Sequence, residues 1–110
     1  MIGDTISEIE ARLKNSSSLT PEARLELTEL LAKLKSEVTE LARTHAEQAA
    51  SIAGFAQTST HEATRSDKNE QLLKLSLDGL SASVDGFEES HPALVQIVNR
   101  ICTTLANLGI

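Results

Sequence analysis

Hydrophobic positions follow one spacing over most of this chain. Across residues 27–55, apolar side chains recur at alternating intervals of four and three residues, which is the heptad pattern of helices that pack along a seam. Only His45 and Gln48 place polar side chains on this seam. The same spacing returns over residues 73–108 and keeps its phase across Pro92. The pattern predicts an all-α protein built from two long helical arms.

Capping and breaking residues divide this pattern into four predicted helices. Thr20 and Pro21 form a helix start, because a hydroxyl can cap and proline needs no N–H at the first helical position. Asp67 and Glu70 have the spacing of a capping box, and Pro92 demands a kink or break. We expect a single domain over residues 1–110, with a short helix at about 4–14, a long helix at about 21–65, and helices at about 67–89 and 92–108.

The short connection between the two arms predicts an antiparallel helical hairpin. In that hairpin, residues whose numbers sum to about 135 lie at the same level, so Phe55 lies near Leu80 and His45 near His91. Gly54 costs the long helix about 1 kcal/mol of propensity relative to alanine. We therefore expect any kink or early end of this helix at Gly54.

The last predicted helix has an unusually uncharged surface, because Arg100 is the only charged residue from His91 to Ile110. A helix that faces water on one side normally carries charge there. We therefore expect a homo-oligomer, most simply a dimer in which two hairpins form a four-helix bundle. The predicted interface consists of apolar side chains of this helix, namely Leu94, Val95, Val98, Ile101, Leu105 and Leu108.

The charge and composition exclude several classes of partner. The chain has 16 acidic and 10 basic residues and a net charge of -6, which opposes binding to nucleic acid and to anionic membranes. Phe55 and Phe87 are the only aromatic residues, too few for stacking bases. No stretch approaches the roughly 18 apolar residues of a membrane span. Cys102 is the single cysteine and the N-terminal residues lack a signal pattern, so we expect a cytoplasmic protein.

Candidate chemistry rests on three histidines, His45, His61 and His91. His61 begins the string His-Glu-Ala-Thr-Arg, in which Arg65 stands where a zinc-protease helix has its second histidine. We interpret His45 and His91 as polar seam residues that fix the register, or His91 as a helix cap. We expect no metal site, no cofactor and no catalytic residue.

These observations favour a non-enzymatic module for helical oligomerisation or protein interaction. One alternative is an adaptor or regulator that binds a partner helix in an apolar groove. A second alternative is a metal-dependent enzyme that uses the three histidines, although a thin helical bundle offers little room for a pocket.

Several short segments resemble a known family. These are residues 51–56 (Ser-Ile-Ala-Gly-Phe-Ala), 61–65 (His-Glu-Ala-Thr-Arg), 87–92 (Phe-Glu-Glu-Ser-His-Pro), 98–101 (Val-Asn-Arg-Ile) and 108–110 (Leu-Gly-Ile). Together they are similar to a family of short bacterial proteins catalogued only as a domain of unknown function. The resemblance covers about the last 60 residues well and the leucine-rich first half more loosely. It implies a small, helical, bacterial and cytoplasmic protein, and it implies no activity or cofactor.

Overall fold

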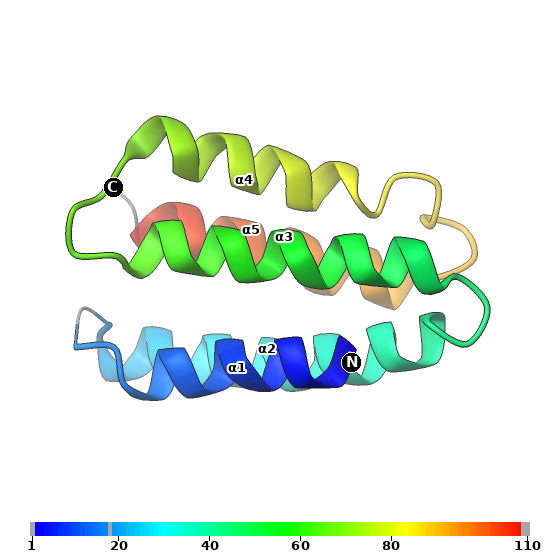
Figure 1. Ribbon diagram of the computed structural model, residues 1–110, viewed down its shortest axis with the longest axis horizontal. Coiled ribbons are helices and arrows are strands. Elements are labelled where there is room, and N and C mark those ends of the chain that lie inside the picture. The colour runs from blue at the N-terminus through cyan, green and yellow to red at the C-terminus, as the bar shows by residue number, and fades with distance from the viewer. Residues whose placement is uncertain (1, 18, 109–110) are drawn as a thin grey trace.

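A computed structural model describes residues 2–17 and 19–108, which form five α-helices and no strand. Consecutive helices run in opposite directions, and all lie roughly along the longest dimension of the molecule, which measures 37 × 24 × 21 Å (Figure 1). The predicted all-α fold is confirmed. The helices are α1 (Ile2–Lys14), α2 (Pro21–Leu41), α3 (Ala46–Thr64), α4 (Glu70–Ala82) and α5 (Pro92–Leu108).

Helix α3 lies at the centre of the bundle. Among the helices of residues 2–108 it is the one that contacts all four others. Figure 1 shows α3 between α1 and α4, in front of α5. Small side chains on a helix allow its neighbours to approach closely. The inward residues of α3 are mostly of this kind, namely Ala49, Ala53, Ala56, Ser59 and Ala63.

The leucine seam of α2 supplies the largest part of the core. Burying a leucine side chain stabilises a protein by roughly 1.5–3 kcal/mol. Helix α1 adds three further buried residues to this core, Ile6, Ile9 and Leu13. Helix α1 begins at Ile2, slightly earlier than predicted. Thr20 accepts a hydrogen bond from the backbone N–H of Ala23 at 3.2 Å, as expected of the α2 cap. The buried residues of α2 are Leu27, Leu30, Leu31, Leu34, Val38 and Leu41.

The predicted long helix over residues 21–65 is wrong, because the chain leaves the helical conformation at residues 42–45. His45 has φ -135° and ψ 63°, and the Thr44 hydroxyl lies 2.8 Å from His45 Nδ1. The Thr44 hydroxyl also donates to the carbonyl of Leu41 at 3.4 Å, and side chain–backbone bonds of this kind compete with helical hydrogen bonds. The turn folds α3 back on α2, which buries apolar surface that a continuous rod would leave exposed. Gly54 lies inside α3 without a break.

Helix α4 is shorter at both ends than the predicted helix over residues 67–89. Asn69, and not Asp67, caps its N-terminus, because Asn69 Oδ1 accepts the N–H of Leu72 at 3.0 Å. Asparagine caps as well as aspartate does, so Asn69 can replace the capping box expected at Asp67 and start the helix two residues later.

The C-terminal end of α4 is fixed by the residues that follow Ala82. Gly86 adopts φ 94°, a conformation that favours glycine and ends helical geometry. Its N–H donates to Glu88 Oε2 at 2.8 Å. The predicted break before Pro92 therefore spans residues 83–91, and α5 begins at Pro92 and ends at Leu108 as expected. Residues 109–110 of the quoted C-terminal segment lie outside the described residues.

Candidate functional site

The prediction of an interface on α5 has to be corrected, because most of the predicted residues belong to the core of this same chain. Leu94, Val98, Ile101 and Leu105 are at most 1% exposed, and α5 packs against α2, α3 and α4. Val95 and Leu108 are partly buried against the same core. These side chains are covered without a second molecule, so their apolarity is no longer evidence for self-association.

The exposed side of α5 is largely polar but carries little charge. It consists of Pro92, Ala93, Gln96, Asn99, Arg100, Thr103 and Asn107. Its one charged residue, Arg100, places Nη2 3.8 Å from Glu26 Oε1 on α2. Thr104 donates its hydroxyl to the same carboxylate oxygen at 3.3 Å. Arg100 and Thr104 therefore link α5 to α2 through the carboxylate of Glu26.

His45 and His91 do meet, as the register predicted. They lie with Phe87 in a cluster of three rings, in which each pair packs edge to face with centroids 5.4 to 6.3 Å apart. Edge-to-face packing is favoured because the positive ring edge meets the negative face. His91 Nδ1 lies 2.9 Å from the Ser90 hydroxyl, and the equivalent atom of His45 contacts Thr44. The cluster joins the α2–α3 and α4–α5 connections.

His61 lies far from this cluster. It is in the last turn of α3, about 24 Å along the helix from His45 at 1.5 Å per residue. Across residues 2–17 and 19–108, no group of three or more histidine, cysteine, aspartate or glutamate side chains is arranged to hold a metal ion. The three histidines are therefore divided between opposite ends of α3.

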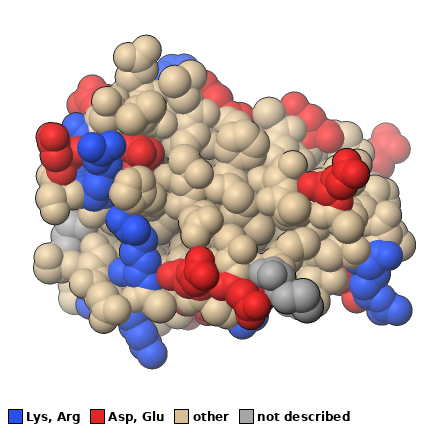
Figure 2. All heavy atoms as spheres, viewed as in Figure 1, with Lys and Arg blue, Asp and Glu red and all other residues tan. Residues whose placement is uncertain are grey.

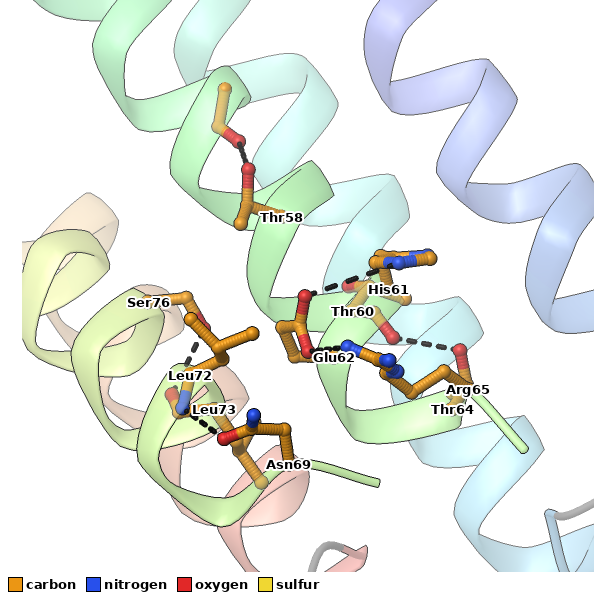
Figure 3. A network of polar contacts seen from close by, with 11 residues as sticks. Thr58, Thr60, His61, Glu62, Thr64, Arg65, Asn69, Leu72, Leu73 and Ser76 are labelled. Carbon is orange, nitrogen blue, oxygen red and sulfur yellow. Dashed lines mark hydrogen bonds and ion pairs between the residues drawn. The ribbon is translucent and has the colours of Figure 1, made fainter. Parts of the chain in front are cut away.

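Glu62 is a buried acid at the C-terminal end of α3. Its residue is 7% exposed, and Figure 3 shows it on the side of α3 that faces α4, between His61 and Arg65. Arg65 Nη1 donates to Glu62 Oε1 at 2.9 Å, and His61 Nε2 lies 3.9 Å from Glu62 Oε2. A buried carboxylate needs such partners, because burial strips it of water.

Other buried polar side chains near Glu62 bind their own helices. Ser59 Oγ donates to the carbonyl of Ala56 at 3.2 Å, and Ser76 Oγ donates to the carbonyl of Leu73 at 2.9 Å. These hydroxyl groups are therefore satisfied by the backbone. A nucleophile would instead need an adjacent base, and neither hydroxyl bonds to one here.

Cys102 points its Sγ toward the carbonyl of Leu77 on α4, at 3.8 Å. Burial raises the pKa of this thiol, and the negative charge of Asp78 raises it further. A raised pKa lowers the fraction of the reactive thiolate. Cys102 is thus a small hydrophobic residue of the α4–α5 contact.

The most distinctive surface lies over α3 and the adjoining edge of α4. Residues 48–61 contain no aspartate, glutamate, lysine or arginine, and Figure 2 shows charged side chains gathered toward the margins of this view. Three large apolar residues are exposed here, Phe55 by 40%, Leu72 by 42% and Leu75 by 59%. We call this surface the uncharged face and define it by Ser51, Gly54, Phe55, Thr58, Leu72 and Leu75.

A second candidate is an open groove of about 690 Å³ between α1 and α2. Its wall includes Leu25, which is 63% exposed. Lys14, Arg24 and Glu10 also border the groove, and Arg24 donates through Nη2 to the carbonyl of Ser16. The groove is thus lined by apolar residues, among them Ala11, Pro21 and Leu25, together with charged residues of both signs.

Sequence reasoning missed both of these surfaces. Leu25, Leu72 and Leu75 lie outside the heptad seams, which signalled that they need cover. Their position relative to the other helices depended on the turn at residues 42–45, which the heptad spacing did not reveal. The charge-free run over residues 48–61 was the available signal for the uncharged face.

Comparison with known proteins identifies a family to which the chain belongs. A family model described as "Domain of unknown function (DUF4404)" matches residues 27–110, and these include all of α3, α4 and α5. No curated protein and no solved structure matches the chain. Among the described residues, none of the helices is both long and apolar enough to cross a membrane.

Proposed function

Because the chain belongs to the DUF4404 family, a domain of unknown function, we propose from its own surfaces that it is a non-enzymatic helical module for protein interaction or self-association. The uncharged face supports this function best. Exposed helices normally carry charge on their outer side, whereas residues 48–61 of α3 carry none. Beside this run, α3 and α4 expose the large apolar residues Phe55, Leu72 and Leu75. Contiguous apolar surface of this kind is typical of interaction sites.

The role of the neighbouring helices is to hold this face rigid. Ile52, Ala53 and Ala56 are buried on the opposite side of α3, and Leu73 and Leu80 are buried beneath the exposed leucines of α4. A contact surface that is anchored in this way loses little conformational entropy on binding. Phe55 is positioned as the aromatic centre of such a contact.

Photo-crosslinking from the uncharged face tests the proposal. A benzophenone amino acid is placed at Leu75 of the full chain, expressed in the cells from which it comes, with Lys33 on α2 as the matched exposed control. We expect a crosslinked product from position 75 that is absent from position 33. The product should also disappear in a Leu72→Lys variant that keeps its helical circular dichroism. Absence of any product at position 75, or equal products at both positions, would refute the proposed function.

An adaptor that binds a partner helix is the second candidate, and the groove beside Leu25 favours it. Groove binding of an amphipathic helix requires apolar positions at helical spacing and charged flanks that match the groove edges. A fluorescent, leucine-rich acidic peptide is a suitable probe, since Lys14 and Arg24 border the groove. The adaptor role predicts binding that Leu25→Lys weakens and Leu75→Lys leaves unchanged, and the reverse pattern would exclude it.

A cytoplasmic location is part of the same proposal. Cys102 is the single cysteine of the chain and is half-buried as a thiol, which suits a reducing compartment. Fractionation of the source cells with an antibody to the chain tests the location. Recovery in a membrane or secreted fraction would contradict it.

A further inference from the structure

We infer, on the basis of the proposed function, that the uncharged face binds a second copy of this chain, docked so that the two α3 helices run antiparallel and cross near Gly54. This partner differs from the dimer expected from the sequence, in which α5 supplied the contact. Four features support this docking: the lack of charge on the face, the residues at the two ends of the charge-free run, the space around Gly54 and the size of the contact.

The first feature is electrostatic. Two copies that each carry a net charge of -6 repel one another over most orientations. Residues 48–61 of α3 carry no charged side chain, so this part of α3 adds no like-charge contact between the two copies. An acidic chain can therefore pair with itself here at lower electrostatic cost than through a charged surface.

The second feature is the pair of residues at the two ends of this run. Glu47 and His61 lie on the exposed side of α3, each seven residues from Gly54. When two α3 helices cross at Gly54 in antiparallel orientation, Glu47 of each copy lies opposite His61 of the other. In a parallel pair, Glu47 would face Glu47, a like-charge contact that destabilises. The ends of the face therefore select the antiparallel arrangement.

The third feature is the space around Gly54. A Cβ built on this glycine would meet no atom within 4 Å, so the α3 backbone is open to a neighbour. A glycine at a helix crossing allows a close approach, as small residues generally do at helix contacts. Phe55 adjoins the crossing and is 40% exposed, so it would be covered by the partner.

The fourth feature is the size of the face. The uncharged face lies on the side of the molecule that Figure 1 views, and this whole side, with α1 included, measures 37 by 24 Å. A stable dimer of ordinary size buries about 800 Å² on each partner. A contact centred on the uncharged face and extending onto the rest of this side has room for an area of that order.

Sedimentation of the full chain over a range of concentrations is the first experiment. We expect a dimer that dissociates on dilution. Gly54→Leu should weaken the dimer by about tenfold or more in Kd, which corresponds to about 1.4 kcal/mol, while the helical content remains unchanged. Lys33→Leu on α2 is the control and should leave Kd unchanged. A folded chain that stays monomeric, or a dimer that Gly54→Leu does not weaken, would overturn the inference.

A charge exchange tests the antiparallel orientation. His61→Glu places a carboxylate opposite Glu47 of the other copy and should weaken the dimer. Adding Glu47→Lys should restore it, because the new lysine then meets the new glutamate. Within one chain these residues lie at opposite ends of α3, so the rescue must act between copies. Failure of the second substitution to restore the dimer would exclude this orientation.

The crosslinked product at Leu75 separates this inference from the proposed function. A product with twice the mass of the chain, yielding only its own peptides, supports the second copy. A product that contains another protein leaves the interaction module standing and overturns the self-association. A monomer in sedimentation with no product at position 75 overturns both.

Discussion

The ring of Phe55 lies directly over Gly79, so that a Cβ built on this glycine would stand 2.3 Å from Phe55 Cε1. The contact joins the exposed edges of α3 and α4 in the middle of the uncharged face. Gly79 is therefore a glycine for steric reasons, since its backbone is helical and alanine would otherwise be preferred there.

Gly79→Ala should destabilise the protein by about 1 kcal/mol, because displacing the ring costs about 1–3 kcal/mol and the gain in helix propensity is about 1 kcal/mol. Gly54→Ala is the matched control and should stabilise by about 1 kcal/mol, since nothing lies within 4 Å of its Cβ. Urea titration by circular dichroism measures both. Adding Phe55→Ala should remove the penalty at Gly79, and equal stabilisation by both alanines would contradict the contact.

Arg65 and Glu62 should respond unequally to substitution. Arg65→Ala leaves the Glu62 carboxylate buried without its close cation, a loss of about 1–3 kcal/mol. Glu62→Gln removes a negative charge from a helix C-terminus, where it is disfavoured, and should cost less than about 1 kcal/mol. The decisive measurement is the double variant. It should be more stable than Arg65→Ala alone, and a further loss in the double variant would count against a buried charge at position 62.

Leu105→Glu should unfold the chain rather than split a dimer. Leu105 is fully buried within the molecule, and an unpaired charge in that environment costs several kcal/mol. Thr103→Glu is the control on the exposed side of α5 and should retain the fold. Circular dichroism combined with sedimentation distinguishes the outcomes, because a folded Leu105→Glu monomer would restore the interface once expected on α5.

Cys102 should react slowly with thiol reagents in the native protein, roughly tenfold more slowly than in the denatured chain near pH 8. The pKa of its thiol is raised by burial and by Asp78, so Asp78→Asn should accelerate the reaction modestly. As pH rises through the ordinary thiol pKa, the unfolded chain loses this proton while the folded chain keeps it, so stability falls. Cys102→Ala should remove that part of the alkaline loss, and rapid native labelling would show that the thiol is exposed.

Much of the fold followed from the sequence because capping and periodicity are local. Thr20 and Pro21 fixed the start of α2, and Pro92 fixed the start of α5. The spacing that placed His45 beside His91 was also correct. The break at residues 42–45 was missed, since helix propensity there is adequate and the turn is selected by the packing of α3 against α1, α2, α4 and α5.

The candidate surfaces could not be predicted for a related reason. Leu30 and Leu75 both lie outside the heptad seams, and one is buried while the other is exposed. Which of them needs a partner depends on how five helices share a core, and this is a property of the whole chain. The low charge of α5 predicted an interface there, whereas most of its apolar side chains are buried within the chain and Phe55, Leu72 and Leu75 are exposed on the uncharged face.

The central place of α3 has a consequence for how the molecule opens. Since every other helix rests on α3, detaching any one of them bares part of this alanine-rich helix, and no pair of helices retains a complete core. Amide protons of α3 should therefore exchange with deuterium only when the entire bundle comes apart, as in the most protected cooperative units. Helix α1 contacts only α2 and α3 among the described helices. Its amide protons should therefore exchange through local openings that cost less free energy than global unfolding.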